Sequence, residues 1–192
     1  FSKFYEIVLA PKFDKISLKI LTSKEKLIVI DSNNLKHTNS REFKSVISGT
    51  LYQDFNSYKI SKSEIKLVSN RKTSNKILED LIFAYKVAKH VKSNAVVLVR
   101  NKQTVGIGAG QMSRLDSTRM AILKYKDTFN HKSFVCASDA FFPFTDNLKI
   151  LLKHNCNGII QPGGSINDYK IVEYATKKKV ALYFVKNRVF KH

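Results

Sequence analysis

The chain has 192 residues, 43% of them hydrophobic, which is enough for one well-buried core or for one domain and part of another. It contains no apolar run near the ~18 residues of a membrane-spanning helix and no signal-peptide pattern, so we expect a cytoplasmic protein that does not enter a membrane. The formal net charge of +19 favours anionic partners, but the lysines are spread over almost every segment without an aromatic-interleaved stripe, which argues against a nucleic-acid-binding protein.

The first third of the sequence predicts a strand, a helix and a second strand, followed by polar connecting structure. Apolar and β-branched residues at 4–10 and 27–30 are typical of strands, and apolar residues at helical spacing predict a helix over 14–21. Asn, Ser and Lys then dominate as far as residue 70, and one strand or hairpin is expected near 43–52.

Beyond a domain boundary that we place between Ser63 and Arg71, helices and strands alternate. Ser74 is a suitable N-cap for an amphipathic helix that should run to His90. This alternation predicts an α/β layer structure with a largely parallel central sheet. The further predicted elements are a hairpin of strands at 95–99 and 104–108, a helix at 114–125, a strand at 134–137, a helix at 146–154, a strand at 158–161, a helix at 167–177 and a strand at 180–185.

Ligands of such sheets bind at the edge where the loops after the strands gather. The glycine-rich segment at the first of these loops fits neither the G-x-G-x-x-G dinucleotide fingerprint nor the Walker phosphate loop. Its glycines, Gly106, Gly108 and Gly110, indicate either a tight turn or a close approach of the backbone to a ligand. The three loops that qualify are 108–114, 138–146 and 161–165.

The other two loops each allow a functional and a structural interpretation. Ser138–Phe144 contains three aromatic residues around a proline, close to Asp139. The rings could stack on a flat heterocycle next to the carboxylate, or they could form a small hydrophobic cluster under the loop. Gln161–Ser165 follows a buried strand, and it offers either backbone amides at a helix start or a simple turn in which Ser165 is the N-cap.

No metal centre or nucleophilic centre is predicted. Cys136 and Cys156 lie in separate segments without a C-x-x-C spacing, so we expect two buried, reduced thiols. His90, His131 and His154 have no partner spacing, and the sequence holds no H-x-E with P-C-x-x-C as in zinc deaminases. No Ser/His/Asp or Cys/His arrangement is indicated either.

Four segments carry a resemblance to a known family. Lys89–Ala95, Ile107–Arg114, Ala137–Phe144 and Ile160–Ser165 occur in the order and spacing of bacterial AICAR transformylases. The whole chain is similar to the C-terminal half of the transformylase domain of the bifunctional purine-biosynthesis enzyme, which combines AICAR transformylase and IMP cyclohydrolase. The resemblance implies transfer of a formyl group from 10-formyltetrahydrofolate, the co-substrate, to AICAR, giving FAICAR in the de novo synthesis of IMP.

The same resemblance implies a fold and an assembly. The family fold is a duplicated cytidine-deaminase-like α/β/α unit without zinc, so residues 1–68 would be the C-terminal part of the first subdomain and residues 69–192 the complete second one. Residues 187–192 resemble the family's R-x-F-x-H C-terminus, whereas the opening resembles a stretch well inside the enzyme, so we expect an N-terminally truncated chain. The full-length enzyme would be a homodimer with its sites at the subunit interface.

Motif matches to the family assign the substrate-binding residues. A planar arginine side chain suits phosphate because it can donate two parallel hydrogen bonds. The residues implied for AICAR are Asn94 and Arg114 at the carboxamide, Phe141 at the imidazole ring, Arg188 at the phosphate, Phe190 in the pocket wall, and Glu6 as a carboxylate. The residues implied for the folate are Asp146 at the pterin, with Leu115, Ser165 and Ile166 in the wall.

The sequence departs from the family where catalysis is concerned. The exocyclic amine of AICAR is a weak nucleophile, so its attack on the formyl carbon needs a base and a proton route to the leaving folate nitrogen. The family's Lys-His pair for this task lies upstream of Glu6, and Lys89-His90 belongs to a different motif. We therefore predict that the chain is part of a folate-dependent formyltransferase. It should hold substrate-binding residues but no catalytic residue and no cyclohydrolase domain, and alone it should not convert AICAR into FAICAR.

Two other interpretations stay open. One is a noncatalytic basic nucleotide- or nucleic-acid-binding protein with the same fold, which would bind arbitrary RNA in a salt-dependent way and would not respond to AICAR. The other is a split enzyme in which a partner chain supplies the lysine and the histidine.

Overall fold

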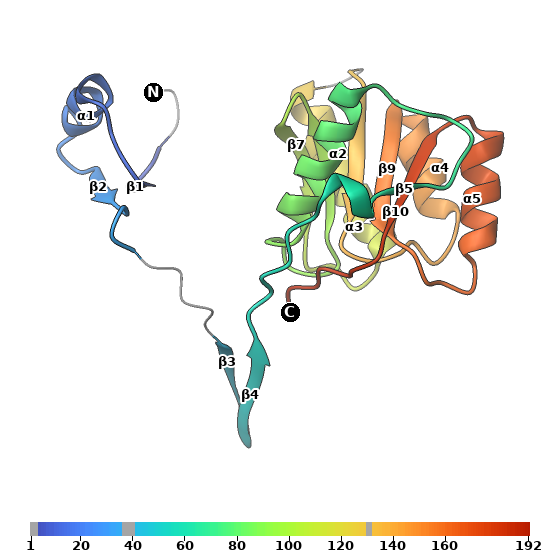
Figure 1. Cartoon of the computed structure of the whole chain (residues 1–192), viewed down its shortest axis with the longest axis horizontal. Helices are drawn as coiled ribbons and strands as arrows, with labels where there is room; N and C mark the ends of the chain where they lie inside the picture. Colours follow the sequence, from blue (N-terminus) through green and yellow to red (C-terminus); the bar gives the residue numbers. More distant parts are fainter. Residues whose placement is uncertain (1–3, 36–40, 130–131) are drawn as a thin grey trace. The chain divides into compact units, whose positions relative to one another are not determined.

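The structure is a computed structural model, and it describes residues 4–35, 41–129 and 132–192 (Figure 1). The chain forms two compact units, Phe1–Ser57 and Tyr58–His192. The second unit begins before the predicted domain start at residue 69, because β5 (Lys66–Leu67) pairs antiparallel with β10 (Ala181–Val185). The assignment of the chain to two subdomains stays a prediction.

In the first unit, β1 (Ile7–Ala10) and β2 (Ile28–Asp31) pair in parallel, and α1 (Lys15–Thr22) lies between them in the sequence. The helix begins after Asp14, whose carboxylate accepts the amide and the hydroxyl of Ser17, both at 2.8 Å, and so caps the first turn. The predicted strand, helix and strand are confirmed.

A hairpin follows in the same unit. β3 (Arg41–Val46) and β4 (Gly49–Asp54) pair antiparallel, which confirms the hairpin expected near residues 43–52. Phe43 lies opposite Tyr52, and their ring centroids are 5.0 Å apart. Every residue of both strands is exposed in the structure, so cross-strand pairs of this kind, rather than a buried face, stabilise the hairpin.

The second unit contains every helix and strand that the sequence predicted beyond residue 70, with ends that differ by a few residues. Ser74 caps α2 (Asn75–Ala88) as predicted, because its hydroxyl oxygen accepts a hydrogen bond from the amide of Ile77 at 3.4 Å. Two elements, η1 (Lys62–Glu64) and β5, are too short for periodicity to indicate. The confirmed elements are α2 (Asn75–Ala88), β6 (Val96–Arg100), β7 (Gln103–Gly108), α3 (Arg114–Phe129), β8 (Phe134–Ser138), α4 (Asp146–Lys153), β9 (Cys156–Pro162), α5 (Asp168–Lys177) and β10.

The described strands of this unit form one sheet in the order β5-β10-β9-β8-β6-β7. β9 is parallel to β8 and β10, whereas β6 is antiparallel to β8 and β7, and β5 is antiparallel to β10. The prediction of a largely parallel sheet is therefore wrong, and the sheet is mixed. The tight turn at Asn101 and Lys102, with φ values of 50° and 55°, makes β6 and β7 antiparallel, as in the predicted hairpin. The hairpin places β6 rather than β7 next to β8, so β6 runs against the strands on both sides of it.

Helices cover both faces of this sheet (Figure 1). Alternate residues of β6 point to opposite faces. Val96 and Leu98 pack in a buried cluster with residues of α3, α4 and α5, and Val97 and Val99 pack in a second cluster with residues of α2. The second unit is therefore a three-layer structure, which confirms the predicted α/β class. In the described ranges, no helix is long and apolar enough to cross a membrane.

β7, β8, β9 and β10 run in one direction, and β6 runs in the opposite direction. The loops that follow the four strands therefore meet at one edge of the sheet, together with the residues that precede β6. This confirms the sequence prediction for the loops after β7, β8 and β9. We call this region the loop edge, and it comprises residues 93–95, 109–114, 139–146, 163–168 and 186–192.

Two glycines allow α3 to pack closely on β7. A Cβ atom added to Gly108 would lie 1.8 Å from the carbonyl oxygen of Ser117, and one added to Gly106 would lie 2.2 Å from that of Ala121. Gly110 has a φ of +65°, as expected for a tight turn. The turn interpretation therefore holds for Gly110, whereas Gly106 and Gly108 allow the close contact between helix and sheet.

Replacing Gly108 by alanine should lower the free energy of unfolding of the second unit by about 3 kcal/mol, because backbone atoms of α3 must move to admit the methyl group. Gly158→Ala is the matched control. It also lies in a buried part of the sheet, but the nearest atoms to its added Cβ belong to side chains at 3.4 Å and 3.6 Å. Urea denaturation followed by circular dichroism measures both variants. Equal losses of stability would contradict this explanation of the glycines.

Candidate functional site

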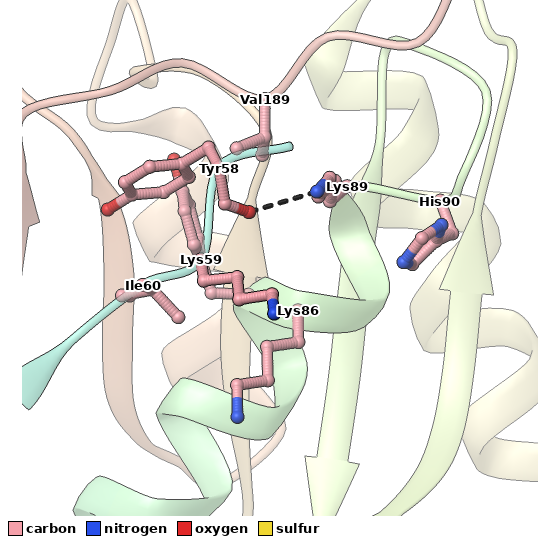
Figure 2. Close-up of a pocket in the computed structure, with 8 residues that line it drawn as sticks. Tyr58, Lys59, Ile60, Lys86, Lys89, His90 and Val189 are labelled. Carbon is pink, nitrogen blue, oxygen red and sulfur yellow. Dashed lines mark hydrogen bonds between the residues drawn. The ribbon is translucent and has the colours of Figure 1, made fainter. Parts of the chain in front are cut away.

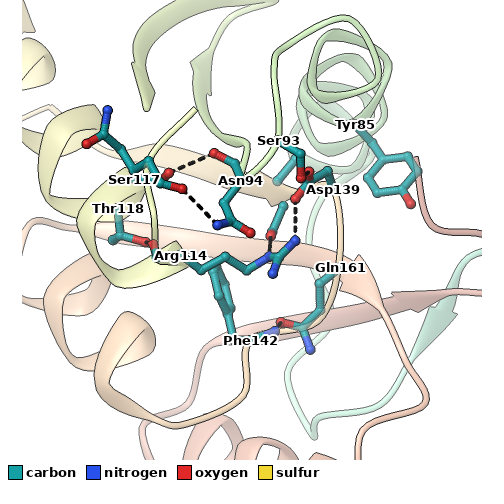
Figure 3. A network of polar contacts seen from close by, with 12 residues as sticks. Tyr85, Ser93, Asn94, Arg114, Ser117, Thr118, Asp139, Phe142 and Gln161 are labelled. Atoms are coloured by element: carbon teal, nitrogen blue, oxygen red, sulfur yellow. Dashed lines mark hydrogen bonds and ion pairs between the residues drawn. The ribbon is translucent and has the colours of Figure 1, made fainter. Parts of the chain in front are cut away.

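A fully buried carboxylate, that of Asp139, lies at the centre of the loop edge (Figure 3). One of its oxygens accepts the hydroxyl of Ser93 at 2.5 Å, and the other pairs with Nη2 of Arg114 at 2.9 Å. The backbone amide of Asp139 donates to the carbonyl oxygen of Ala95 (3.3 Å), and its carbonyl oxygen accepts the amide of Val189 (3.0 Å). Because a buried charge requires such partners, Asp139 joins three other segments of the chain to the end of β8.

Arg114 is the first residue of α3, and its side chain is only 14% exposed. In addition to the ion pair with Asp139, its Nε donates to the hydroxyl oxygen of Ser138 at 3.2 Å. Its guanidinium carbon also lies 5.8 Å from the centre of the Phe190 ring. The guanidinium is thus fixed in orientation between a buried carboxylate and an aromatic ring.

The C-terminal tail, residues 186–192, lies at the loop edge without forming a helix or strand. Hydrogen bonds with three other segments hold its backbone. These are the bond from the hydroxyl of Tyr85 to the carbonyl oxygen of Asn187, the bond from the amide of Val189 to Asp139, and the bond from the amide of Ser93 to the carbonyl oxygen of Lys191 at 2.9 Å. The tail is therefore part of the packed structure.

Side chains of the tail alternate in exposure. Val189 is 1% exposed and belongs to the core on the α2 face, whereas Arg188 and Phe190 on either side of it are exposed. The guanidinium carbon of Arg188 lies 4.8 Å from the centre of the Phe141 ring. The tail therefore presents one arginine and one aromatic ring at the loop edge and an apolar side chain to the core.

Asn94 positions the loop that precedes α3. Its side-chain NH2 donates to the carbonyl oxygen of Gln111 at 2.9 Å, and its backbone carbonyl oxygen accepts the hydroxyl of Ser117 at 2.7 Å (Figure 3). The start of β6 is thereby attached both to the loop and to the first turns of α3, on which Arg114 lies.

The two adjacent phenylalanines after β8 have different environments. Phe142 is fully buried, and its amide donates to Oε1 of Gln161 at 3.1 Å. Phe141 is half-buried beside Arg188. Phe142 therefore belongs to the hydrophobic core, in line with the structural interpretation of this loop, while Phe141 lies at its rim. Asp139 is not the ligand-facing carboxylate of the other interpretation, because it is fully buried and paired.

Two hydrogen bonds connect the segments that carry the predicted folate residues. The hydroxyl of Thr118 in α3 donates to Oδ1 of Asn147 in α4 at 2.8 Å. The side-chain amide of Asn167, before α5, donates to the carbonyl oxygen of Pro143 in the loop after β8 at 3.3 Å. The loop edge thus gathers the segments that hold Leu115, Asp146, Ser165 and Ile166.

Ser165 is not the N-cap of α5, so that part of the sequence prediction is wrong. The cap position belongs to Asn167, and the hydroxyl oxygen of Ser165 accepts the amide of Asn167 at 3.2 Å within the preceding turn. The carboxylate of Asp168, the first residue of α5, accepts a hydrogen bond from the amide of Gly164 at 2.7 Å and so joins the helix to the start of the turn. Ile166 remains 94% exposed in this turn.

Five of the six residues predicted for AICAR lie at the loop edge. Two contacts join members of this group, namely Arg114 with the ring of Phe190 and Arg188 with the ring of Phe141. The sixth residue, Glu6, is an exposed residue just before β1 in the other unit, and its part in the site stays a prediction. The five residues are Asn94, Arg114, Phe141, Arg188 and Phe190.

Sequence reasoning missed the residues that hold this group in place. The only sequence signal for Ser93 and Asp139 was that both lie in segments that carry the family resemblance. Nothing in the sequence indicates that these two side chains, 46 positions apart, form a hydrogen bond. The roles of Gln161 and Val189 likewise depend on contacts between distant segments.

The cysteines and His154 give no nucleophilic centre, and the described residues give no metal centre. Cys136 and Cys156 are buried and free, as predicted, and burial raises the pKa of both thiols, that of Cys156 to about 12. Neither therefore offers a thiolate. Burial, followed by the charges of nearby lysines, lowers the pKa of His154. His131 lies outside the described residues, and the described ranges hold no group of three or more His, Cys, Asp or Glu side chains that could bind a metal ion.

Comparisons with known proteins give a consistent result. The family model described as "AICARFT/IMPCHase bienzyme" matches residues 1–124. The chain is 42% identical to the bifunctional purine biosynthesis protein PurH of Buchnera aphidicola, over 99% of this chain and 37% of that protein. It is 44% identical to the protein of the same name from Caldicellulosiruptor bescii, over 98% of this chain and 36% of that protein. The chain thus spans just over a third of the length of these relatives.

Asp139→Asn should lower the free energy of unfolding by about 3 kcal/mol, because it leaves the guanidinium of Arg114, which is only 14% exposed, without a countercharge. Asp116→Asn is the matched control, since its ion pair with Arg119 is exposed and should contribute little. Urea denaturation measures both. If the two variants were equally stable, Asp139 would not organise the loop edge.

Proposed function

The chain belongs to the AICARFT/IMPCHase bienzyme family, and from this premise we propose that it carries part of an AICAR formyltransferase site. The reaction transfers a formyl group from 10-formyltetrahydrofolate to AICAR and gives FAICAR in the biosynthesis of IMP. The loop edge is the region that we assign to both substrates.

The contacts of two arginines with two phenylalanines support this proposal most directly. Arg114 lies by Phe190, and Arg188 lies by Phe141. AICAR is a flat imidazole that carries a carboxamide and a ribose phosphate. Aromatic rings suit the heterocycle by stacking, and an exposed guanidinium suits the phosphate because it can donate two parallel hydrogen bonds. We therefore assign the phosphate to Arg188 and the ring to Phe141, with Phe190 in the wall.

The carboxamide of AICAR is assigned to Asn94 and Arg114. The ion pair with Asp139 fixes the guanidinium of Arg114, so this donor needs no rearrangement to bind a carbonyl oxygen. The NH2 of Asn94 is engaged by Gln111, so the side-chain oxygen of Asn94 is the atom that would accept the carboxamide N–H. The two side chains together would recognise both ends of an amide.

The folate is assigned to the side of the loop edge between α3, α4 and α5. Oδ1 of Asp146 accepts the amide of Asn147 at 2.7 Å, and its carboxylate would accept N–H groups of the pterin. Leu115 and the exposed Ile166 would supply an apolar wall, with Ser165 beside them. These residue types fit a flat bicyclic ring that carries hydrogen-bond donors at one end.

The base that activates the amine of AICAR is not assigned to any residue of this chain. The family's Lys-His pair finds no match in the 192 residues, and the relatives are much longer than the matched region. We propose that residues of the longer protein, and a second copy of it in a homodimer, complete the site. The chain by itself would bind substrates without turning them over.

We also propose that residues 69–192 form a cytidine-deaminase-like unit without zinc, and that residues 1–68 belong to a preceding unit of the same kind. The three-layer arrangement of the second unit and its mixed sheet support the first part of this proposal. The parallel pair β1–β2 joined through α1 is compatible with the second part.

A noncatalytic nucleotide- or nucleic-acid-binding protein is the second candidate. The net charge of +19 favours it, because a positive field attracts phosphate without regard to sequence. Such a protein would bind arbitrary RNA with an affinity that falls steeply with salt, and AICAR would not compete.

Titration calorimetry of this chain should show AICAR binding that weakens about tenfold or more in Arg188→Gln, because a charge-assisted contact to phosphate is lost. The nucleoside that lacks the phosphate should bind the unmodified chain and Arg188→Gln equally. Arg119→Gln, which changes an exposed arginine paired with Asp116, is the matched control and should leave AICAR binding unchanged. A well-folded chain that does not bind AICAR would contradict the proposal.

A further inference from the structure

A cavity of about 510 Å³ lies next to the C-terminal tail on the α2 face of the second unit (Figure 2). It is bounded by the last turns of α2, by residues 58–60 and by Val189. The residues assigned to AICAR and folate do not line it. Its volume is within the range of sites for small organic molecules.

The ionisable side chains that line the cavity, apart from two tyrosines, are Lys59, Lys86, Lys89 and His90. None of the described lining residues is a carboxylate. The ammonium group of Lys89 donates to the carbonyl oxygen of Tyr58 at 2.9 Å, which fixes it at the cavity wall (Figure 2). Burial and then the charge of Lys59 lower the pKa of Lys89, so the positive charges here oppose one another.

Apolar groups form another part of the wall. Ile60 is 9% exposed, Tyr85 is 1% exposed and Val189 is 1% exposed, and the three pack in the core cluster on this face of the sheet. The cavity therefore combines a cationic part with an apolar part. A ligand that matches it has an anionic group at one end and an apolar body at the other.

The helix dipole alone does not explain these lysines. Cations are favoured at the C-terminal end of a helix, and this accounts for Lys86 and Lys89. Lys59 comes from a different segment, and neither Lys59 nor Lys86 has an ion-pair partner within the described ranges. A bound anion would supply the missing countercharge.

We propose that this cavity is a second binding site of the protein, for a phosphate monoester whose organic part is apolar. Lys59 and Lys89 hold the phosphate, Lys86 adds positive charge at the cavity wall, and Ile60 and Val189 contact the organic part. A doubly charged phosphate suits a group of lysines better than a single carboxylate does. Among the described lining residues only Val189 belongs to the loop edge, and it faces the core, whereas Arg188 and Phe190 on either side of it are exposed.

Phenyl phosphate is a suitable probe, with phenol and inorganic phosphate as its two halves. Amide chemical shifts of this chain in 1H–15N NMR spectra, followed during titration, should change at residues 59–60, at 86–90 and at 189 and should give the affinity. Phenyl phosphate should bind at least about tenfold more tightly than either half, because the cavity offers a partner to both ends.

Lys59→Gln/Lys86→Gln should weaken this binding about tenfold or more, since two of the three cations are lost while the structural hydrogen bond of Lys89 remains. Lys124→Gln/Lys153→Gln is the matched control. It removes the same charge from exposed positions on α3 and α4 and should leave the affinity unchanged.

Three results would overturn the proposal. The first is the absence of phenyl phosphate binding. The second is an equal loss of affinity in the two double variants, which would indicate nonspecific attraction to a basic chain. The third is a loss of affinity in Arg188→Gln, which would place the probe at the loop edge. Because phenyl phosphate is not a substrate of the proposed transferase, failure here leaves the AICAR proposal untouched. Failure of AICAR to bind likewise leaves the second site untouched.

Discussion

A carboxylate removed from water must be paired and hydrogen-bonded, and the buried side chain of Asp139 imposes this requirement on the second unit. Its partners are a hydroxyl before β6 and a guanidinium at the start of α3, from Ser93 and Arg114. The backbone of the same residue binds Ala95 and Val189. One residue at the end of β8 thus determines where three other segments lie, and the geometry of the loop edge follows from it.

The C-terminal tail shows how this constraint serves function. Its backbone is bound through Asn187, Val189 and Lys191, so its side chains have defined directions. Arg188 and Phe190 reach the loop edge, where each contacts a residue of the proposed AICAR site. Val189 between them lines the lysine-rich cavity on the α2 face. The two proposed sites therefore share one short segment, and their ligands would contact opposite sides of it.

The sequence was sufficient for local structure and insufficient for pairing between distant segments. Periodicity and N-cap residues predicted the helices and most strands, because such signals depend on near neighbours, as Ser74 illustrates. The two-residue strand β5 and the mixed sheet were missed, since strand order depends on long-range contacts. For the site, motif resemblance indicated Arg114 and Arg188. It did not indicate that Asp139, 25 positions from Arg114, would be its buried partner.

Amide hydrogen exchange of Val189 tests the central claim most directly. This residue lies in a segment without helix or strand, close to the last residue of the sequence, and its amide donates to the carbonyl oxygen of Asp139 at 3.0 Å. If Asp139 holds the tail on the end of β8, this amide should exchange as slowly as amides inside the sheet. Exchange at the rate of an unprotected peptide would show that the tail is not held, and it would contradict the account of the loop edge.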